Sequence, residues 1–316
     1  MSILPFTIDN KKRILVAGAG GGYDFLCGLP IVLELESQGC EVLIANYSFT
    51  NLNEIQNATW HNKRLLETDS TSVLPNSDYF PELLLSKWYK SKGINKSVWC
   101  IAHGGVRPTL TSYNYLINKF NIDTVFCVDG GVDGIFRGDE YDLGTPSMDS
   151  ISVISASLCD ASDKIYVCTA FGTEGAANEV SHAQALNRIS DLMKENALIG
   201  VSVLNRAEKP GNEFISAMNY IFHQTEPIKR SIIISTILAS MEGVYGKVSV
   251  HPKTEYNPPW ISPLTALLWF FDAQNVAKMK LFYEESITSA EVSDVADAID
   301  RARKSTSVKQ YESIPI

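Results

Sequence analysis

The chain has 316 residues, of which 45% are hydrophobic and 20% charged, and its formal net charge is −9 at pH 7. This length and composition predict a single α/β domain over residues 1–316 and exclude a disordered chain. The negative charge disfavours nucleic-acid binding, because phosphate contacts need clustered Lys and Arg. The apolar runs are far shorter than the ~20 residues that span a membrane, so we expect no membrane contact.

The cysteines predict a reducing compartment. None belongs to a C-x-x-C pair, and several lie inside apolar runs, namely among Cys27, Cys40, Cys100, Cys127, Cys159 and Cys168. Such cysteines are typical of small buried hydrophobic residues in a cytoplasmic protein. The spacing disfavours a zinc site or a disulfide framework.

The first predicted strand, residues 13–17, leads into a glycine-rich loop and a helix that runs to residue 35. Asp24 is expected to cap that helix. The glycines allow backbone N–H groups to approach an anionic or hydroxyl-rich part of a ligand, and the candidates are Gly20, Gly21 and Gly22.

The same loop only partly fits the dinucleotide pattern G-x-G-x-x-G. Gly18 and Gly20 match, but the third position is Tyr23. The second strand, residues 41–45, ends in Asn46 instead of the acid that would hold a ribose hydroxyl. An NAD(P)-dependent oxidoreductase therefore stays as an alternative, with Asn46 kept as a ligand-binding candidate.

Residues 48–95 form a long polar excursion with one predicted helix, 81–92, and we expect them to act as a lid. The third strand, 97–102, ends in His103, a candidate acid or base, and a helix follows over 109–120. The chain has no G-x-S-x-G sequence, which sets α/β-hydrolase chemistry aside.

The stretch from residue 125 to 146 contains the largest number of candidate site residues. A buried strand at 125–128 is followed by an acid-rich loop, which closes at Thr145 and Pro146, expected as the cap and first turn of a helix. Carboxylate oxygens suit a hard divalent cation, so Mg²⁺ or Mn²⁺ is expected at Asp129, Asp133 and Asp139. Arg137 would clamp an anion or offset the carboxylates, with Glu140 beside it.

The fifth strand, 164–169, leads to Glu174, and a helix after it carries Glu179 and His182 on one face. A sixth strand is predicted at 200–204. From residue 205 to 316 the chain is expected to be mainly helical, with helices at 213–222, 232–241, 264–280 and 289–303.

The strand ends share a pattern: nearly every one is followed by glycine and by an ionisable or amide side chain. In a parallel sheet these ends lie at one edge, where ligands bind. The sequence also resembles an uncharacterised family of soluble proteins, known mostly from archaea and bacteria and catalogued only as a domain of unknown function. Three stretches carry the resemblance: AGAGGGYDFLCGLP, VDGGVDGIFRGDEYDLGTP and ISPLTALLWFFDAQNVAKM. It implies a Rossmann-like fold and no particular activity.

Together these observations predict a doubly wound, mostly parallel sheet with a helical C-terminal region, which binds a nucleotide- or nucleoside-like ligand. The favoured activity is hydrolysis of a phosphoester or N-glycosidic bond. The alternatives are the oxidoreductase above and a non-enzymatic sensor or assembly subunit. A homo-oligomer is also expected. The candidate catalytic residues are Asp129, Asp133, His103, His182 and Glu174, and the candidate ligand-binding residues are Gly20, Gly21, Gly22, Asp24, Asn46, Arg137, Asp139 and Glu140.

Overall fold

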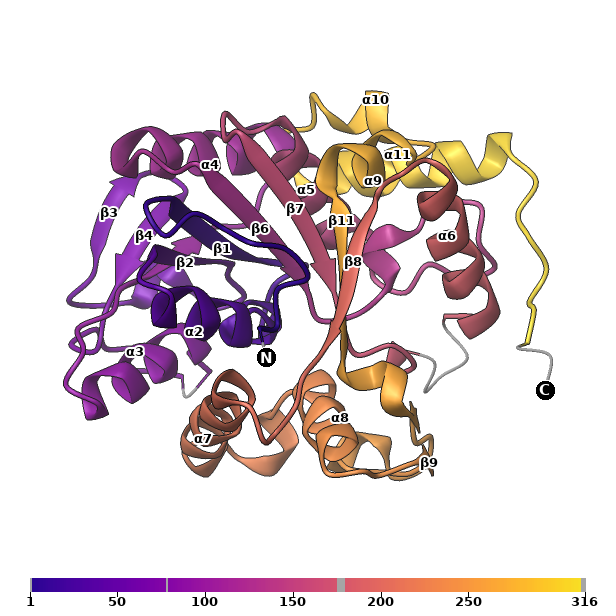
Figure 1. The fold of residues 1–316 in the computed structure, drawn as a ribbon. Helices are drawn as coiled ribbons and strands as arrows, with labels where there is room; N and C mark the ends of the chain where they lie inside the picture. Colours follow the sequence, from indigo (N-terminus) through magenta and orange to yellow (C-terminus); the bar gives the residue numbers. More distant parts are fainter. Residues whose placement is uncertain (1, 78, 175–179, 314–316) are drawn as a thin grey trace.

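The structure is a computed structural model, and it describes residues 2–77, 79–174 and 180–313. A central sheet is covered by helices on both faces, which gives three layers (Figure 1). No helix in these three ranges is long and apolar enough to cross a membrane.

The main sheet has nine strands in the order β3-β4-β5-β2-β1-β6-β7-β11-β8. The five central strands are parallel, and antiparallel strands extend the sheet at both sides. The bounds are β1 Arg13–Ala19, β2 Glu41–Tyr47, β3 Thr59–Asn62, β4 Leu65–Thr68, β5 Val98–Ile101, β6 Thr124–Asp129, β7 Asp163–Cys168, β8 Leu198–Val203 and β11 Leu267–Asp272. The predicted doubly wound α/β fold is confirmed.

Two further strands form a small ribbon, β9 Gly246–Lys247 with β10 Trp260–Ile261. The helices longer than one turn are α2 Leu29–Ser37, α3 Pro81–Ser91, α4 Val106–Phe120, α5 Pro146–Leu158, α6 His182–Lys194, α7 Lys209–His223, α8 Ile232–Met241, α9 Ala273–Lys278 and α11 Val292–Ser305. Single turns form α1 Asp24–Cys27 and α10 Tyr283–Ser286.

The two helix layers enclose separate cores. The alternation of side chains along β1 shows this, since Ile14 and Val16 pack into one core and Leu15 and Ala17 into the other. Helices α1, α2, α3, α7 and α8 bury their apolar residues on the first face, and α4, α5, α6, α9 and α11 on the second. Because both faces are buried, the central strands are apolar throughout, as their sequences predict.

Residues 48–95 contain more than the expected helix. The hairpin of β3 and β4 lies within them and pairs antiparallel with β5, which adds two strands to the sheet. The turn between the two strands carries Lys63 and Arg64 at the carboxyl edge of β5. Part of this excursion therefore belongs to the sheet.

The predicted helix at 264–280 is wrong. A short turn, Pro263–Ala266, is followed by strand β11, and only Ala273–Lys278 is helical. The run Leu-Leu-Trp-Phe-Phe is rich in aromatic residues, which favour strands, and periodicity cannot distinguish so short an apolar run from a helix. In the sheet, this run pairs antiparallel with β7.

Two local expectations also need correction. Asp24 is not the helix cap, because Tyr23 occupies that position and Asp24 lies in the first turn of α1. Thr145 does precede α5, but its side chain makes no capping bond; its N–H and its hydroxyl both donate to Asp133 instead.

Candidate functional site: a buried carboxylate pocket

The site lies where the sheet reverses its winding direction. From the end of β1 the chain enters α1 on one face of the sheet, and from the end of neighbouring β6 it passes to α5 on the other face. The loops diverge there and leave a crevice at the carboxyl edge, which is the general place for ligands in such sheets.

Five carboxylates meet in this crevice. They line a pocket of about 230 Å³ together with Gly130, Gly144, Thr145 and Ile233. We call it the acidic pocket, and its carboxylates are Asp24, Asp129, Asp133, Asp149 and Glu174. These five residues are far apart in the sequence, since they lie at the end of β6 or in the loops and helices that follow β1, β6 and β7.

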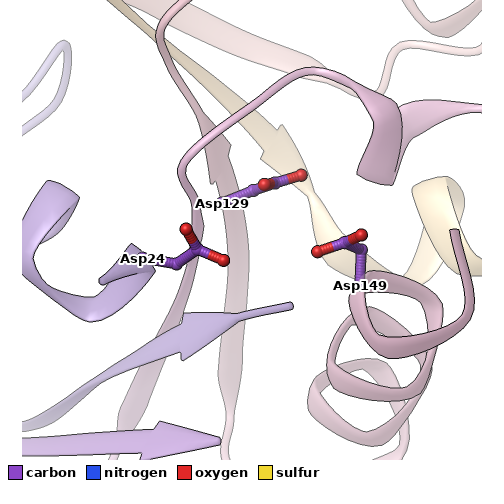
Figure 2. Close-up of side chains that lie close together, drawn as sticks. All are labelled: Asp24, Asp129 and Asp149. Atoms are coloured by element: carbon purple, nitrogen blue, oxygen red, sulfur yellow. The ribbon is translucent and has the colours of Figure 1, made fainter. Parts of the chain in front are cut away.

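Three of these side chains point toward one another (Figure 2). Asp24 starts α1, Asp129 ends β6 and Asp149 lies in the first turn of α5. Each offers one oxygen, and these oxygens lie within 4.8 Å of one another. Oxygens bound to one Mg²⁺ ion lie at most ~4 Å apart, so these three carboxylates are near enough to converge on a single hard divalent cation.

Asp149 gives the second indication of a ligand. Its side chain is buried, with 3% exposed, and its Oδ2 has no hydrogen-bond partner in the part of the chain that the structure describes. A buried charged oxygen without a partner costs free energy, and such groups are normally hydrogen-bonded or coordinated to a metal. The carboxylate faces Asp24 and Asp129 across the crevice.

The other carboxylates are held by bonds that fix the loops. Tyr166 Oη and the Gly134 N–H donate to Asp129 Oδ2, the latter at 3.1 Å. The Val132 N–H donates to Glu174 Oε2 at 2.8 Å. These bonds orient the carboxylates and leave room on their pocket side.

No Lys, Arg or His forms an ion pair with any of the five carboxylates within residues 2–77, 79–174 and 180–313. Lys280 is a buried cation whose charge acts on Asp149 and Asp133, and its ammonium donates to the carbonyls of Gly134 and Phe136 at 2.8 and 2.9 Å. Burial lowers the pKa of Lys280 to about 8. The pocket therefore concentrates negative charge with little compensation.

The pKa values reflect this crowding. Burial, followed by the charge of Asp133, raises the pKa of Asp129 to about 7. Burial raises the pKa of Asp24, Asp149 and Glu174 well above their ordinary values, and the charges of neighbouring pocket carboxylates raise it further. Opposed carboxylates with raised pKa values are common at sites that bind a cation or transfer a proton.

Glycines make the close approach feasible. A Cβ on Gly20 would overlap Asp149, one on Gly130 would overlap Asp24, and one on Gly131 would overlap Glu174. In the same way, a Cβ on Gly134 would overlap Asp129, and one on Gly144 would overlap Asp133. The glycines that the sequence places beside the acids therefore make space for carboxylates.

The remaining residues of the acid-rich loop lie outside the pocket. Asp139 forms ion pairs with Arg137 at 3.4 Å and Lys309 at 3.6 Å. Glu140 is fully buried and accepts the N–H groups of Arg137 and Gly138. The expected cation set of Asp129, Asp133 and Asp139 is therefore not brought together, whereas Asp129 and Asp133 do share the pocket.

The two candidate histidines also lie apart from the carboxylates. His103 stacks on Tyr47 and lines a different pocket. His182 begins α6 and packs beside Phe171. Burial lowers the pKa of both histidines. Glu179, the expected neighbour of His182, lies outside the described residues.

The amide nitrogen of Asn46 makes hydrogen bonds within the protein. It donates to the Gly22 carbonyl at 2.9 Å and to Glu82 at 2.8 Å, and the side chain is fully buried. It joins the glycine loop to α3 at the carboxyl end of β2, and its Oδ1 has no hydrogen-bond partner among the described residues. The amide takes the place of the acid that the dinucleotide pattern requires there.

The sequence reasoning missed two residues, Asp149 and Lys280. Asp149 lies four positions into a helix, and one signal was present, since an acid in the first turn after a strand-end loop faces the carboxyl edge. Lys280 comes from a region 130 residues further along the chain, and no local pattern connects it to the site.

The fold and pocket define an α/β protein with a carboxylate site at the switch point of its sheet. A family model matches residues 15–312, and the chain belongs to that family, described as a protein of unknown function, DUF1152. This confirms the resemblance to an uncharacterised family. Comparisons with curated proteins and with solved structures gave no match.

Proposed function

We propose that the protein is a divalent-metal-dependent hydrolase of a small phosphorylated, nucleotide-like compound. The observation that carries the proposal is the buried Asp149 carboxylate, which lies with Asp24 and Asp129 in a pocket of five carboxylates and whose Oδ2 has no hydrogen-bond partner among the described residues. Mg²⁺ or Mn²⁺ held by these three side chains would neutralise the pocket and attract a phosphate group.

The N-terminus of α5 supports an anionic ligand. Gly144 and Thr145, which lead into this helix, line the pocket. Their N–H groups donate to Asp142 and Asp133, so the attraction for a phosphate at this position comes from the helix dipole. The phosphate would then lie between the cation and the first turn of α5.

Asp133 and Glu174 would carry the proton. They lie beside the three metal-binding candidates, and the charge of Asp133 contributes to the raised pKa of Glu174. Water would attack phosphorus and lose a proton to one of these two carboxylates, the phosphorus–oxygen ester bond would break, and the leaving oxygen would take a proton from the other, protonated carboxyl group. The bound cation would stabilise the negative charge that develops on the phosphate.

Calorimetry with Mg²⁺ and Mn²⁺, followed by phosphate-release assays on nucleotides and sugar phosphates, tests the proposal. We expect metal binding and metal-dependent release of phosphate in the wild type, and both should be weakened in Asp149→Asn. Nucleotide binding without a product would favour the sensor or assembly subunit, and reduction of NAD(P) would favour the oxidoreductase. Absence of metal binding would exclude the metal-dependent version.

The order β5-β2-β1-β6-β7 of the parallel strands supports a Rossmann-like assignment. We also propose a cytoplasmic location, which is supported by six buried cysteines that are all unpaired. Fractionation of cells that produce the protein would test the location.

We propose a homodimer formed through β8, the last strand of the sheet. Ile199, Val201 and Val203 are 43%, 38% and 51% exposed on it, and the strand carries no charge that would repel a second copy of a negatively charged chain. Exposed apolar edge strands favour pairing. Light scattering should give a dimer for the wild type and a monomer for Val201→Lys; a monomeric wild type would contradict the proposal.

A further inference from the structure

A second pocket opens at the same edge of the sheet, beyond the ends of β2 and β5. It has a volume of about 330 Å³. The loop after β2 is joined to the end of β5 by the Ser48 N–H, which donates to the Ile101 carbonyl at 2.9 Å. We call it the aromatic pocket, and the residues that matter here are Phe49, Trp60, Lys63, Arg64 and His103. The loop after β2 and the β3–β4 hairpin supply most of its wall.

The lining combines exposed rings with positive charge. Phe49 is 43% exposed and Trp60 41% exposed, although both line a concave site. Lys63 has no ion pair in the described part of the chain, whereas Arg64 is paired with Glu291 at 3.1 Å and donates to the His103 carbonyl. Open aromatic faces beside a free cation suit a planar ring that carries or adjoins negative charge.

The glycine loop after β1 lies against residues of both pockets. A Cβ on Gly20 would strike Asp149 and Asp24, whereas a Cβ on Gly21 would strike the ring of Phe49. Adjacent residues of the same loop therefore touch the acidic pocket and the aromatic pocket. Since consecutive Cα atoms lie ~3.8 Å apart, residues of the two pockets pack against neighbouring positions of one loop.

We propose that the aromatic pocket binds the nucleobase of the ligand whose phosphate is held in the acidic pocket. The base stacks on Phe49 and Trp60, and the phosphate crosses the glycine loop toward the cation site. This inference rests on the proposed function, and it narrows the substrate class to nucleoside phosphates. It also assigns a ligand-binding role to part of residues 48–95.

Trp60 provides a direct readout. Titration of the full chain with AMP, GMP and adenosine in the presence of Mg²⁺ should quench tryptophan fluorescence, because a stacked base contacts the indole ring. The quench should be lost in Trp60→Phe. Trp260 is 42% exposed and lies outside both pockets, so Trp260→Phe is the matched control and should keep the quench.

Calorimetry separates the two pockets. Phe49→Ala should weaken AMP and adenosine about tenfold or more, because stacking on a base contributes that much, and should leave Mg²⁺ affinity unchanged. Asp149→Asn should weaken Mg²⁺ and AMP but leave adenosine, which has no phosphate, unchanged.

The failures of the two proposals differ. If Mg²⁺ binds but no nucleoside or nucleotide does, or if binding does not respond to Phe49→Ala and Trp60→Phe, the aromatic pocket is not a base site and the metal proposal stands. If adenosine binds in a Phe49-dependent manner and no metal binds, the base site stands and the metal-dependent hydrolase is excluded.

Discussion

Two groups of acids from one loop have opposite surroundings. Asp129 and Asp133 face three other carboxylates, with no ion pair in the described ranges. Asp139 and Glu140 lie only a few residues further on. Asp139 is paired with two cations, and Glu140 accepts two backbone N–H groups.

The difference separates a fold-stabilising acid from a ligand-binding candidate. Glu140 shapes the turn at 137–140, and Arg303 reinforces it by donating to the carbonyls of Gly138 and Glu140. Asp129 and its pocket neighbours repel one another, which costs stability unless a ligand supplies positive charge. Four measurements test this difference.

The largest expected effect is on the pH dependence of stability. Asp129 has a pKa of about 7 in the folded chain against 3.8 ordinarily, so between these values the folded state holds more protons than the unfolded state. The free energy of unfolding should therefore fall as pH rises from about 4 to about 7, by about 4 kcal/mol for such a difference. Urea unfolding at several pH values, in buffer that contains a metal chelator, measures this free energy.

Excess Mn²⁺ should flatten that slope, because a bound cation favours the ionised carboxylates. A stability that rises with pH over this range in metal-free buffer would show that the pocket carboxylates are not destabilised by one another.

The next effect is on metal affinity. Asp149→Asn should weaken Mn²⁺ binding roughly ten- to a hundredfold, equivalent to ~1.5–3 kcal/mol, and raise the melting temperature in chelator because one repelling charge is removed. Glu140→Gln is the matched control, since its amide would face an N–H group that Glu140 now accepts. It should lose ~1–3 kcal/mol of stability and keep Mn²⁺ affinity.

A lower melting temperature for Asp149→Asn with unchanged Mn²⁺ affinity would assign Asp149 to the fold. Loss of Mn²⁺ affinity in Glu140→Gln would move the cation site toward residues 137–140. Calorimetry and thermal unfolding give both quantities.

A smaller effect should come from the glycine loop. Gly20→Ala and Gly93→Ala place Ala at similar positive φ, +78° and +80°, so both carry a backbone cost of ~1–2 kcal/mol. Only Gly20 lies against Asp149; nothing lies within 4 Å of a Cβ on Gly93. Gly20→Ala should therefore lose more stability than Gly93→Ala and also lose Mn²⁺ affinity. Equal losses in both variants would mean that the loop can shift without disturbing Asp149.

The smallest effect is expected for Asp139→Asn. Its ion pairs are long and its partners are about one-third exposed, so stability should change by less than ~1 kcal/mol. Mn²⁺ affinity should stay the same, because Asp139 lies outside the acidic pocket. A marked loss of Mn²⁺ binding, measured by calorimetry, would restore the cation set expected from sequence spacing.

Much of the fold was predictable because buried parallel strands have continuous apolar sequences. The five central strands and helices α4, α7, α8 and α11 were expected within a few residues of their observed bounds. The β3–β4 hairpin was not, since its strands are four residues long and their sequences, Thr-Trp-His-Asn and Leu-Leu-Glu-Thr, have no regular alternation of apolar and polar residues. Strand β11 was mistaken for a helix because its run is short and apolar throughout.

The sequence predicted a ligand site at the carboxyl edge of the sheet, because glycines and acids follow the ends of its parallel strands, and its candidates included Asp24, Asp129, Asp133 and Glu174. Which acids meet depends on the tertiary structure. Asp149 and Asp24 join the pocket because α5 and α1 leave neighbouring strands on opposite faces, and Asp139 leaves it because Arg137 and Lys309 neutralise it elsewhere. Spacing along a loop fixes which groups are near in sequence, whereas the winding of the sheet fixes which are near in space.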